Sequence, residues 1–558
     1  MAQVDEMSEL MTSDDEDYLL SDDSSGESDV LDSVDEDVQV ADELSWRPAI
    51  VGNDASTRDI EFFGTPGLNP GIIVPADVEN STSFFLGLFL SDSLFEDLAM
   101  WTNRRAWAAI HSLDADDLPV SLLQWNECSA NEVKKLIGMY LYMGSNKKTE
   151  MNDYWSTGSY HSTPYFQAPE ALSRDRFKQL LGFLRFYDCL EDPTPGDPLY
   201  KIRPFLNNLR DTCVNIYRPD EEISVDESLV LYKGRLGFKQ YIPTKRARYG
   251  IKVYCACESE TGYLFNFRVH ATPEENRRFA LDPQSGNLSF SEKIVVELCQ
   301  DLLDQGYRIF ADKWFGSYRL AKYLLDRDTH LTCTIRADRG VPIELRQLNV
   351  PPNDVGFMRK GAVLAAKIVE RKESGLKTLY LLDTNEAASK VPVRRIARGG
   401  AAAAVQKCRS ALSYNRCMGG VDRMDGHMQP YQPARKTRKW FLKLGLHLCL
   451  QMVRNAWIVY CKCGGRKVFV KFLEASIREF VQSTGMSRRR AAAAAQAFGQ
   501  VSPHFPMRIA ARESQPRPTK RCRVCYRAER IKRSIYCCPA CPGEPGLCLE
   551  TCFQQWHS

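Results

Sequence analysis

Apolar residues in the first third of the chain recur at mixed three- and four-residue spacing. The pattern is clearest in residues 84–100, 133–143 and 177–186, and stretches rich in Ser, Pro and Asn separate these segments. Such spacing places the apolar side chains on one face of a helix, where they are buried. The chain from about Ser83 to Asp188 is therefore predicted to be mostly helical.

From about Pro219 the apolar positions form short runs that are rich in β-branched and aromatic residues and bounded by Gly, Asp and Thr. Runs of this kind predict strands. Helical patterns lie among them at residues 290–305 and 317–326. The predicted strands are 223–232, 250–258, 263–270 and 308–311.

Residues 328–395 carry further strand-like pieces and no long helical pattern, which predicts a β-rich insertion. The most apolar window comes later, at residues 441–460. Its leucines first alternate with period two, but the run continues for the length of a helix, which favours a buried helix. Polar residues inside the window, such as Lys443 and Arg454, make it too polar to face lipid.

The chain has 558 residues, of which 44% are hydrophobic and 26% charged. A chain of this length can bury several cores, and we expect roughly three or four domains. No apolar stretch follows a basic region near the N-terminus, so we expect neither a signal peptide nor a membrane anchor. The protein is expected to be soluble.

Charge is distributed unevenly. Residues 1–46 contain 17 Asp and Glu and no Lys or Arg, so the remainder carries all 73 basic residues against 54 acidic ones, an excess of +19. The acidic segment is expected to be disordered. Its serines precede acids and suit an acidophilic kinase, although a solvated acidic tail is an equal alternative. The basic remainder indicates a polyanionic partner such as nucleic acid, or only a surface of interspersed charge.

Carboxylates at the ends of apolar runs indicate a cation site. Asp226 and Asp312 follow strand-like runs, and Asp422 and Asp425 follow the double glycine Gly419-Gly420. If a helix begins at the glycines, the spacing of three residues sets both acids on one helical face. For one of this pair, a capping role at the helix N-terminus is the alternative.

Phosphoryl transfer on nucleic acid is the chemistry that needs such a cluster. Two divalent ions activate the attacking oxygen and stabilise the leaving one, and carboxylate oxygens suit Mg²⁺. Carboxylates from two strands and a helix match an RNase H-like sheet. The sequence therefore predicts a Mg²⁺ site built on an α/β core.

Cysteines are concentrated near the end of the chain, where 7 of the 19 lie in the last 37 residues. The pairs Cys522/Cys525 and Cys538/Cys541 have CxxC spacing, and Cys548, Cys552 and His557 follow. Without a secretory signal this pattern favours structural Zn²⁺ over disulfides. These seven ligands fall one short of two tetrahedral sites, and Cys537 is either the eighth ligand or a bystander.

Several motifs resemble the piggyBac family of transposases. The matching stretches run from about Phe84 to the end of the chain, and together they are highly specific. They are Met151-Asn-Asp-Tyr-Trp-Ser156, Asp197-Pro-Leu-Tyr-Lys-Ile-Arg-Pro204, Ile223-Ser-Val-Asp-Glu-Ser228, Tyr241-Ile-Pro-Thr-Lys245, Tyr249-Gly-Ile-Lys252, Ala311-Asp-Lys-Trp-Phe315, Thr334-Ile-Arg-Ala337, Tyr414-Asn415 and Gly419-Gly-Val-Asp-Arg-Met-Asp425.

The resemblance implies that Asp226, Asp312 and Asp422 form a catalytic, Mg²⁺-binding triad and that Asp425 is a further acid of the site. It also implies an RNase H-like core with a β-rich insertion, a mostly helical discontinuous domain for dimerisation and DNA binding, and a small zinc-binding cysteine-rich domain. The expected parts are an acidic tail (1–46), the helical domain (80–220 and 431–486), the catalytic core (221–335 and 411–430), the insertion (336–410), a basic linker (487–521) and the cysteine-rich domain (522–558).

Two positions depart from the family pattern. Lys313 stands where many relatives have Asn beside the second acid, and Cys408 stands where Pro is common. A cation next to Asp312 is expected to modulate metal affinity or to contact DNA.

Basic residues close to the acids are the predicted DNA contacts. They lie ahead of and after the acidic motif, and their charge would neutralise phosphates and make binding salt-dependent. Trp440 either stacks on an unpaired base or packs in the core. The predicted contacts are Lys245, Arg248, Arg435, Lys436, Arg438, Lys439 and Trp440, with Arg394, Arg395, Arg398 and Arg488–Arg490 as weaker candidates.

For the cysteine-rich domain the resemblance implies a cross-braced zinc fold that recognises the terminal inverted repeats of a transposon. Cys522, Cys525, Cys538, Cys541, Cys548, Cys552 and His557 are its expected ligands. A ubiquitin-ligase RING, which expects eight ligands, and a chromatin-reading finger are the alternatives.

The resemblance therefore implies a nuclear, Mg²⁺-dependent enzyme that works as a homodimer. It would be a cut-and-paste DNA transposase that acts on transposon ends and TTAA targets in double-stranded DNA, or its domesticated derivative. The first alternative is a non-catalytic DNA-binding or chromatin protein that keeps the fold. A nuclease without strand transfer is the second.

Overall fold

The structure is a computed structural model in two compact units, which divide between residues 483 and 484. The residues that it describes are 45–54, 57–112, 125–158, 160, 162–191, 196–243, 248–271, 287–372, 375–396, 402–433, 436–482, 507–509, 518–528, 530–538, 541, 544–549 and 551–557.

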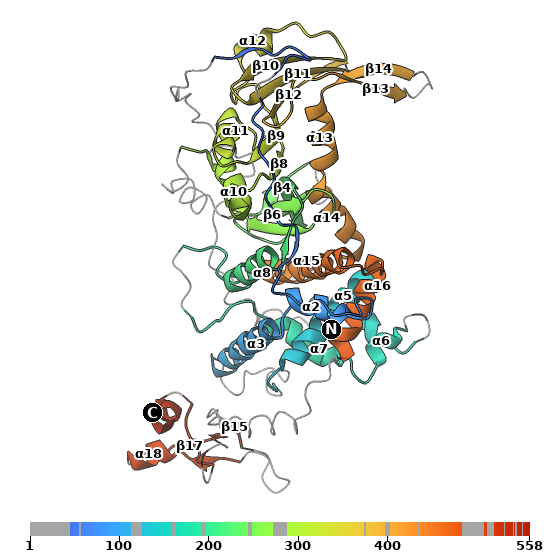
Figure 1. Cartoon of the computed structure of the whole chain (residues 1–558). Helices are drawn as coiled ribbons and strands as arrows, with labels where there is room; N and C mark the ends of the chain where they lie inside the picture. The colour runs from blue at the N-terminus through green and yellow to red at the C-terminus, as the bar shows by residue number, and fades with distance from the viewer. Residues whose placement is uncertain are drawn as a thin grey trace. The chain divides into compact units, whose positions relative to one another are not determined.

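The centre of the first unit is a five-stranded mixed sheet in the order β7-β6-β4-β8-β9 (Figure 1). The first three strands are antiparallel, and β4 pairs in parallel with β8, which pairs in parallel with β9. Helix α10 (Phe290–Cys299) and the 3₁₀ helix η3 (Gln300–Leu302) precede β8, and α11 (Tyr318–Leu325) connects β8 to β9. The strands are β4 (Glu222–Leu231), β6 (Tyr249–Glu258), β7 (Leu264–Val269), β8 (Arg308–Ala311) and β9 (His330–Ile335).

The sheet continues beyond β9 into the insertion. Strand β12 pairs antiparallel with β9, and β11, β10 and β1 follow in order. A separate hairpin of β13 (Val391–Ile396) and β14 (Ala402–Lys407) leads to helix α13 (Arg409–Cys417) and then α14 (Gly420–Met428). The other elements are β1 (Arg47–Pro48), β5 (Gln240–Tyr241, beside β6), α12 (Ile343–Gln347), β10 (Asp354–Lys360), β11 (Val363–Lys372) and β12 (Gly375–Asp383).

Helices from both ends of the unit pack together. Helix α16 packs on α5, and α15 packs on α2. A capping box between Ser129 and Glu132 begins α5, because the two side chains satisfy backbone N–H groups that the helix leaves unpaired. The helices are α2 (Thr82–Phe89), α3 (Asp92–Ser112), α5 (Ala130–Ser145), η1 (Met151–Trp155), α6 (Pro164–Gln167), α7 (Arg174–Phe183), α8 (Arg203–Ile216), η4 (Gln429–Tyr431), α15 (Trp440–Lys462) and α16 (Phe469–Gln482).

Helix α15 is the buried helix that the apolar window predicts. Its polar residues Gln451 and Asn455 are buried and hydrogen-bond to each other at 3.1 Å, and Asn455 also bonds to the backbone of Leu264. Among the described residues, no helix has both the length and the apolar character that a membrane crossing requires.

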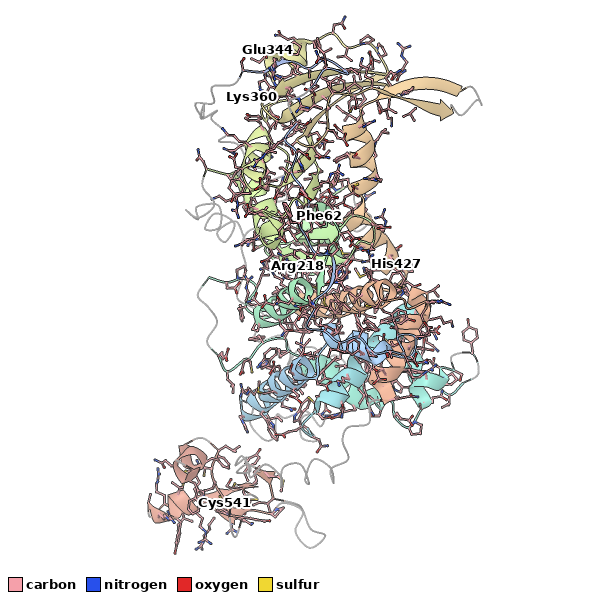
Figure 2. The ribbon with its side chains drawn as sticks, viewed as in Figure 1. Phe62, Arg218, Glu344, Lys360, His427 and Cys541 are labelled. Carbon is pink, nitrogen blue, oxygen red and sulfur yellow. The ribbon has the colours of Figure 1, made fainter. Side chains whose placement is uncertain are left out.

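An N-terminal strap, here residues 45–54 and 57–80, runs across the first unit (Figures 1 and 2). Strand β1 lies on the edge of β10, and Asp54 accepts two hydrogen bonds from Arg359, whose side chain is 1% exposed. Further along, Phe62 packs edge-on against Tyr307 of the core. The pairing of β2 (Gly67–Leu68) with β3 (Tyr217–Arg218) ties the strap to the end of α8.

The second unit is small and contains most of the clustered cysteines. Strands β15 (Met507–Arg508) and β18 (Tyr536–Cys537) form one pair, and β16 (Lys520–Arg521) and β17 (Arg533–Ser534) form another. Two helices, α18 (Arg523–Arg527) and α19 (Thr551–His557), pack together. The predicted fold class is confirmed: an α/β core, a β-rich insertion, helices before and after the core, and a cysteine-rich end.

Candidate active site

Asp226 and Asp312 meet on neighbouring strands. In the parallel pair of β4 and β8, Val225 lies opposite Ala311, so each acid is the next residue along its strand direction. Ala311 ends β8 and is fully buried, whereas Asp312 is half-buried. The sequence placed Asp226 near the end of a strand, but it lies inside β4, opposite Cys255 of β6. The pairing of β4 with β8 ends at Val225 and Ala311, so both carboxylates lie just beyond the last paired residues.

Backbone N–H groups hold both carboxylates. Asp226 Oδ1 accepts from the N–H of Glu227 at 2.8 Å, and Asp312 Oδ1 accepts from the N–H of Trp314 at 2.8 Å. The main-chain carbonyl of Asp312 also accepts from the N–H groups of Phe315 and Gly316. The turn after β8 is therefore closed around Asp312.

Helix α14 brings Asp422 and Asp425 to the same face of the core. The helix begins at Gly420, and an added Cβ there would lie 2.2 Å from Ser224 Oγ of β4 and 3.0 Å from the carbonyl of Glu258. Only glycine permits this approach. Asp422 lies in the first turn and is exposed, whereas Asp425 is half-buried and accepts a hydrogen bond of 2.7 Å from Ser228 Oγ.

Arg454 of α15 helps to hold α14 in place, a role that the sequence did not predict. This buried side chain of α15 donates to the carbonyls of Thr261 and Gly262 at 2.7 and 2.6 Å, and to Nδ1 of His427 on α14. Burial lowers the pKa of Arg454 to about 10. The only signal in the sequence was a basic residue inside an otherwise apolar helix.

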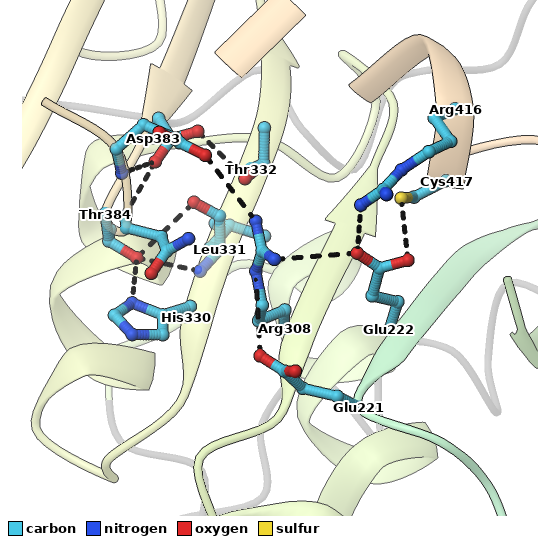
Figure 3. A network of polar contacts seen from close by, with 12 residues as sticks. Glu221, Glu222, Arg308, His330, Leu331, Thr332, Asp383, Thr384, Arg416 and Cys417 are labelled. Atoms are coloured by element: carbon cyan, nitrogen blue, oxygen red, sulfur yellow. Dashed lines mark hydrogen bonds and ion pairs between the residues drawn. The ribbon is translucent and has the colours of Figure 1, made fainter. Parts of the chain in front are cut away.

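A second support lies at the opposite, amino-terminal ends of the same strands. Figure 3 shows Glu222, the first residue of β4, between Arg308 of β8 and two residues of α13. Its carboxylate accepts from Arg416 and lies 3.5 Å from Arg308 Nη1 and 3.1 Å from Cys417 Sγ. Cys417 stands directly before the segment that enters α14, so this network anchors the chain where it returns from the insertion.

Carboxylate oxygens are hard ligands of the kind that Mg²⁺ prefers, so the donor set of Asp226, Asp312 and Asp422 fits this ion. The three carboxylates are not drawn together as tightly as a closed ligand shell. In the part of the chain that the structure describes, only four cysteines form a group whose ligand atoms all lie within 4.8 Å of one another.

Those four cysteines are Cys522, Cys525, Cys548 and Cys552. Cys525 Sγ lies 3.5 Å from Cys552 Sγ and 3.9 Å from Cys548 Sγ. Four sulfurs this close fit tetrahedral Zn²⁺. The pair Cys522/Cys525 thus shares one site with Cys548 and Cys552, and the intervening pair Cys538/Cys541 is not part of it.

The remaining predicted cysteine ligands lie outside this group. The N–H of Cys541 contacts the carbonyl of Cys538 at 3.4 Å, as expected of a CxxC turn. Cys537 is buried in β18. His557 ends α19, but its side chain lies outside the described residues, so a second site stays a prediction.

The predicted DNA contacts divide into exposed and packed side chains. Arg248, Lys436 and Arg438 are exposed. Lys439 Nζ donates to the carbonyl of Gly182 at 2.7 Å, and Trp440 packs edge-on against Phe238 at 5.2 Å between ring centroids. For these two residues DNA contact stays a prediction beside the packing that is observed. Lys245, Arg435, Arg398, Arg488–Arg490 and the side chains of Arg394 and Arg395 lie outside the described residues.

Comparison with known proteins identifies the family. A family model described as Transposase IS4 matches residues 81–457, and a model described as a DDE_Tnp_1-like zinc finger matches residues 504–558. Human PiggyBac transposable element-derived protein 2 is 26% identical over 421 residues, which cover 73% of this chain. The chain belongs to the piggyBac transposase family.

Another human relative, PiggyBac transposable element-derived protein 3, is 23% identical over 72% of this chain. The matches span 66% and 65% of the two relatives' own lengths, slightly less than two thirds. A cryo-EM structure of a piggyBac transposase synaptic complex with hairpin DNA aligns with a TM-score of 0.60 and 20% identity, covering 88% of this chain and 100% of that one. This likeness extends the piggyBac fold over nearly the whole chain.

Proposed function

We propose that this protein is a cut-and-paste DNA transposase that binds terminal inverted repeats, cleaves through hairpin ends and integrates at TTAA targets. The observation that carries the proposal is the parallel register of β4 and β8, which sets Asp226 beside Asp312. Helix α14 adds Asp422 and Asp425 against the same strand. Acids from two neighbouring strands and a helix suit hydrolysis and transfer of phosphodiesters.

Asp226, Asp312 and Asp422 would hold the divalent ions. When bound, Mg²⁺ lowers the pKa of the attacking water or hydroxyl and stabilises the leaving oxygen. The backbone N–H groups of Glu227 and Trp314 orient two of these carboxylates before DNA arrives. Asp425, with one oxygen engaged by Ser228, supports the site from the side of α14.

The proposed reaction consists of successive transfers at phosphorus. Water attacks the phosphodiester at the element's end and releases a 3′ hydroxyl. This hydroxyl attacks the opposite strand and displaces its 3′ oxygen, which closes a hairpin. Water then opens the hairpin, and the 3′ ends attack the target. Each step exchanges one P–O bond for another, so no covalent enzyme intermediate is required.

DNA binding is proposed at the basic surface beside the site, where Arg248, Lys436 and Arg438 are exposed. The cysteine-rich unit would recognise the inverted repeats, with Zn²⁺ on its four clustered cysteines. Because both ends of an element must be held together, a homodimer is the proposed working form. A nuclear location follows from this substrate.

Incubation of the purified protein with Mg²⁺ and a DNA that bears its own flanking repeats tests the proposal. Wild type should cleave at the repeat ends, and Asp312→Ala should not. Asp326→Ala is the matched control, because Asp326 is an exposed acid at the end of α11. It should cleave as wild type does.

Two results would contradict the proposal in different ways. Equal cleavage by wild type and Asp312→Ala would remove the triad from the mechanism. If wild type, Asp312→Ala and Asp326→Ala all bind the DNA and none of them cleaves it, the alternative is favoured, a domesticated DNA-binding protein that keeps the fold.

A further inference from the structure

An aromatic pair with a cation on it stands directly beside Asp312. Trp314 and Tyr254 stack with ring centroids 5.4 Å apart and an interplanar angle of 12°. The ammonium of Lys252 lies 4.6 Å from the Trp314 ring and 4.9 Å from the Tyr254 ring. A cation at this distance from an indole face is attracted by its quadrupole. Lys252 therefore holds the Trp314 ring in place.

Trp314 is also fixed through its backbone. Its carbonyl accepts a hydrogen bond of 2.6 Å from Arg339 Nη1, and the buried Arg339 also reaches Ser291 Oγ of α10 at 3.2 Å. Its N–H donates to Asp312 Oδ1 at 2.8 Å. The ring, the carbonyl and the N–H of one residue are thus each held by a different partner.

The stack adjoins the site at Asp312, whose carboxylate accepts from the N–H of Trp314. Along β6, Lys252 and Tyr254 are two residues apart and share one face of the sheet. Asp226 lies opposite Cys255, so its side chain belongs to the other face, where α14 packs. An effect of Lys252 on the acids must then pass through Trp314.

We propose that Trp314 is a positioning residue that fixes the Asp312 carboxylate for metal binding, and that Lys252 and Arg339 hold Trp314 in that position. The inference rests on the proposed function, because it assigns Asp312 to a metal. Trp314→Ala and Trp314→Phe both keep the backbone N–H that donates to Asp312. What the replacement removes is the ring that fixes where the N–H points.

Mn²⁺ binding to the full-length, DNA-free protein, measured by EPR, tests this without relying on activity. Partners that orient a metal ligand contribute about 10-fold or more to metal affinity, so Trp314→Ala and Lys252→Met should each weaken binding by about 10-fold. Trp314→Phe and Lys252→Arg should recover part of the loss, because a ring and a cation return. Cleavage should need correspondingly more Mg²⁺ in each variant.

Lys360→Met is the matched control, because Lys360 is also a lysine over an aromatic ring, 4.9 Å from that of Tyr318, but it ends β10 of the insertion. It should bind Mn²⁺ as wild type does. Melting temperatures identify variants that do not fold, and if Trp314→Ala fails to fold, Trp314→Phe and Lys252→Met decide.

Folded variants with wild-type Mn²⁺ affinity would overturn the inference and leave the proposed function intact, provided that wild type cleaves. Lys252→Met that keeps its Mn²⁺ affinity but loses salt-dependent DNA affinity would also overturn it, because Lys252 would then contact phosphate. A wild-type protein that neither binds Mn²⁺ nor cleaves would overturn both proposals.

Discussion

Asp422 and Asp425 lie three residues apart on α14, yet their surroundings differ. Asp422 is exposed in the first turn, where its carboxylate is accessible to a substrate or an ion. Asp425 is half-buried and accepts from Ser228. A carboxylate held by a neutral hydroxyl is well oriented but has less freedom to bind an ion directly.

Replacement of the two acids should therefore have unequal effects. Asp422→Asn should lower the cleavage rate by at least about 1,000-fold, as expected for a residue that acts on the reacting atoms. Asp425→Asn and Ser228→Ala should lower it by about 10- to 100-fold, as expected for support around a metal ligand. Single-turnover cleavage measures all three variants. Equal losses for Asp422→Asn and Asp425→Asn would show that the two acids share one role.

For single residues, the sequence singled out the acids as candidates but not the residues that hold them. Asp226, Asp312 and Asp422 each stand in a recognisable motif. Arg454 and Glu222 do not, because their roles depend on contacts with Gly262, Arg308 and Arg416 that are far away in the chain. A polar residue in an apolar run indicates that a partner exists but not which one.

Among the elements, α14 approaches the sheet most closely at its first residue. The first helical residue, Gly420, packs on β4 and on the turn after β6, whereas nothing lies within 4 Å of a Cβ added at Gly419. Arg423 donates to the carbonyl of Ser259 and fastens the same end of the helix. The two glycines therefore have different functions although they are adjacent.

Gly420→Ala should displace α14 and, with it, Asp422. An extra methyl in a packed site typically costs about 1–3 kcal/mol, so the free energy of unfolding should fall by about that amount and cleavage should fall with it. Gly419→Ala should change neither by much. Chemical denaturation and cleavage rates of the two variants provide the comparison, and equal behaviour would mean that Ser224 yields to the methyl group.

Element types were largely predictable from local pattern, but their pairing was not. The strands of the core, α11 and α15 match the predicted segments closely. The pairing of β4 with β8, which are separated by three other strands in the sequence, carries no local signal. The hairpin of β13 and β14 was also missed, because half of its second strand is Ala, which favours a helix by propensity alone.

Across the whole molecule, the cysteine-rich unit has a separate source of stability. Among the residues of this unit that the structure describes, few apolar side chains other than the cysteines are buried. A domain of this size cannot fold on its core alone, so its folding should depend on the metal that Cys522, Cys525, Cys548 and Cys552 hold.

Removal of that metal should unfold the second unit and spare the first. Cys525→Ser should lose the bound zinc, and hydrogen exchange in residues 518–557 should rise to that of an unfolded chain while exchange in the core sheet stays slow. Cys537→Ser should keep the four-sulfur site, since Cys537 is not part of it. Zinc content and hydrogen exchange by mass spectrometry measure both, and faster exchange in the core of Cys525→Ser would show that the units are coupled.

The continuity of the sheet from β9 into β12 limits how the catalytic part can be transplanted. Excision of residues 336–410 would uncover the long edge of β9, whose side chains are almost all buried, and would leave the N-terminal strap without β10. A bare apolar edge recruits strands from other chains. The smallest portable module is therefore the core together with its insertion and strap, so chimeras between relatives should exchange all three as one block.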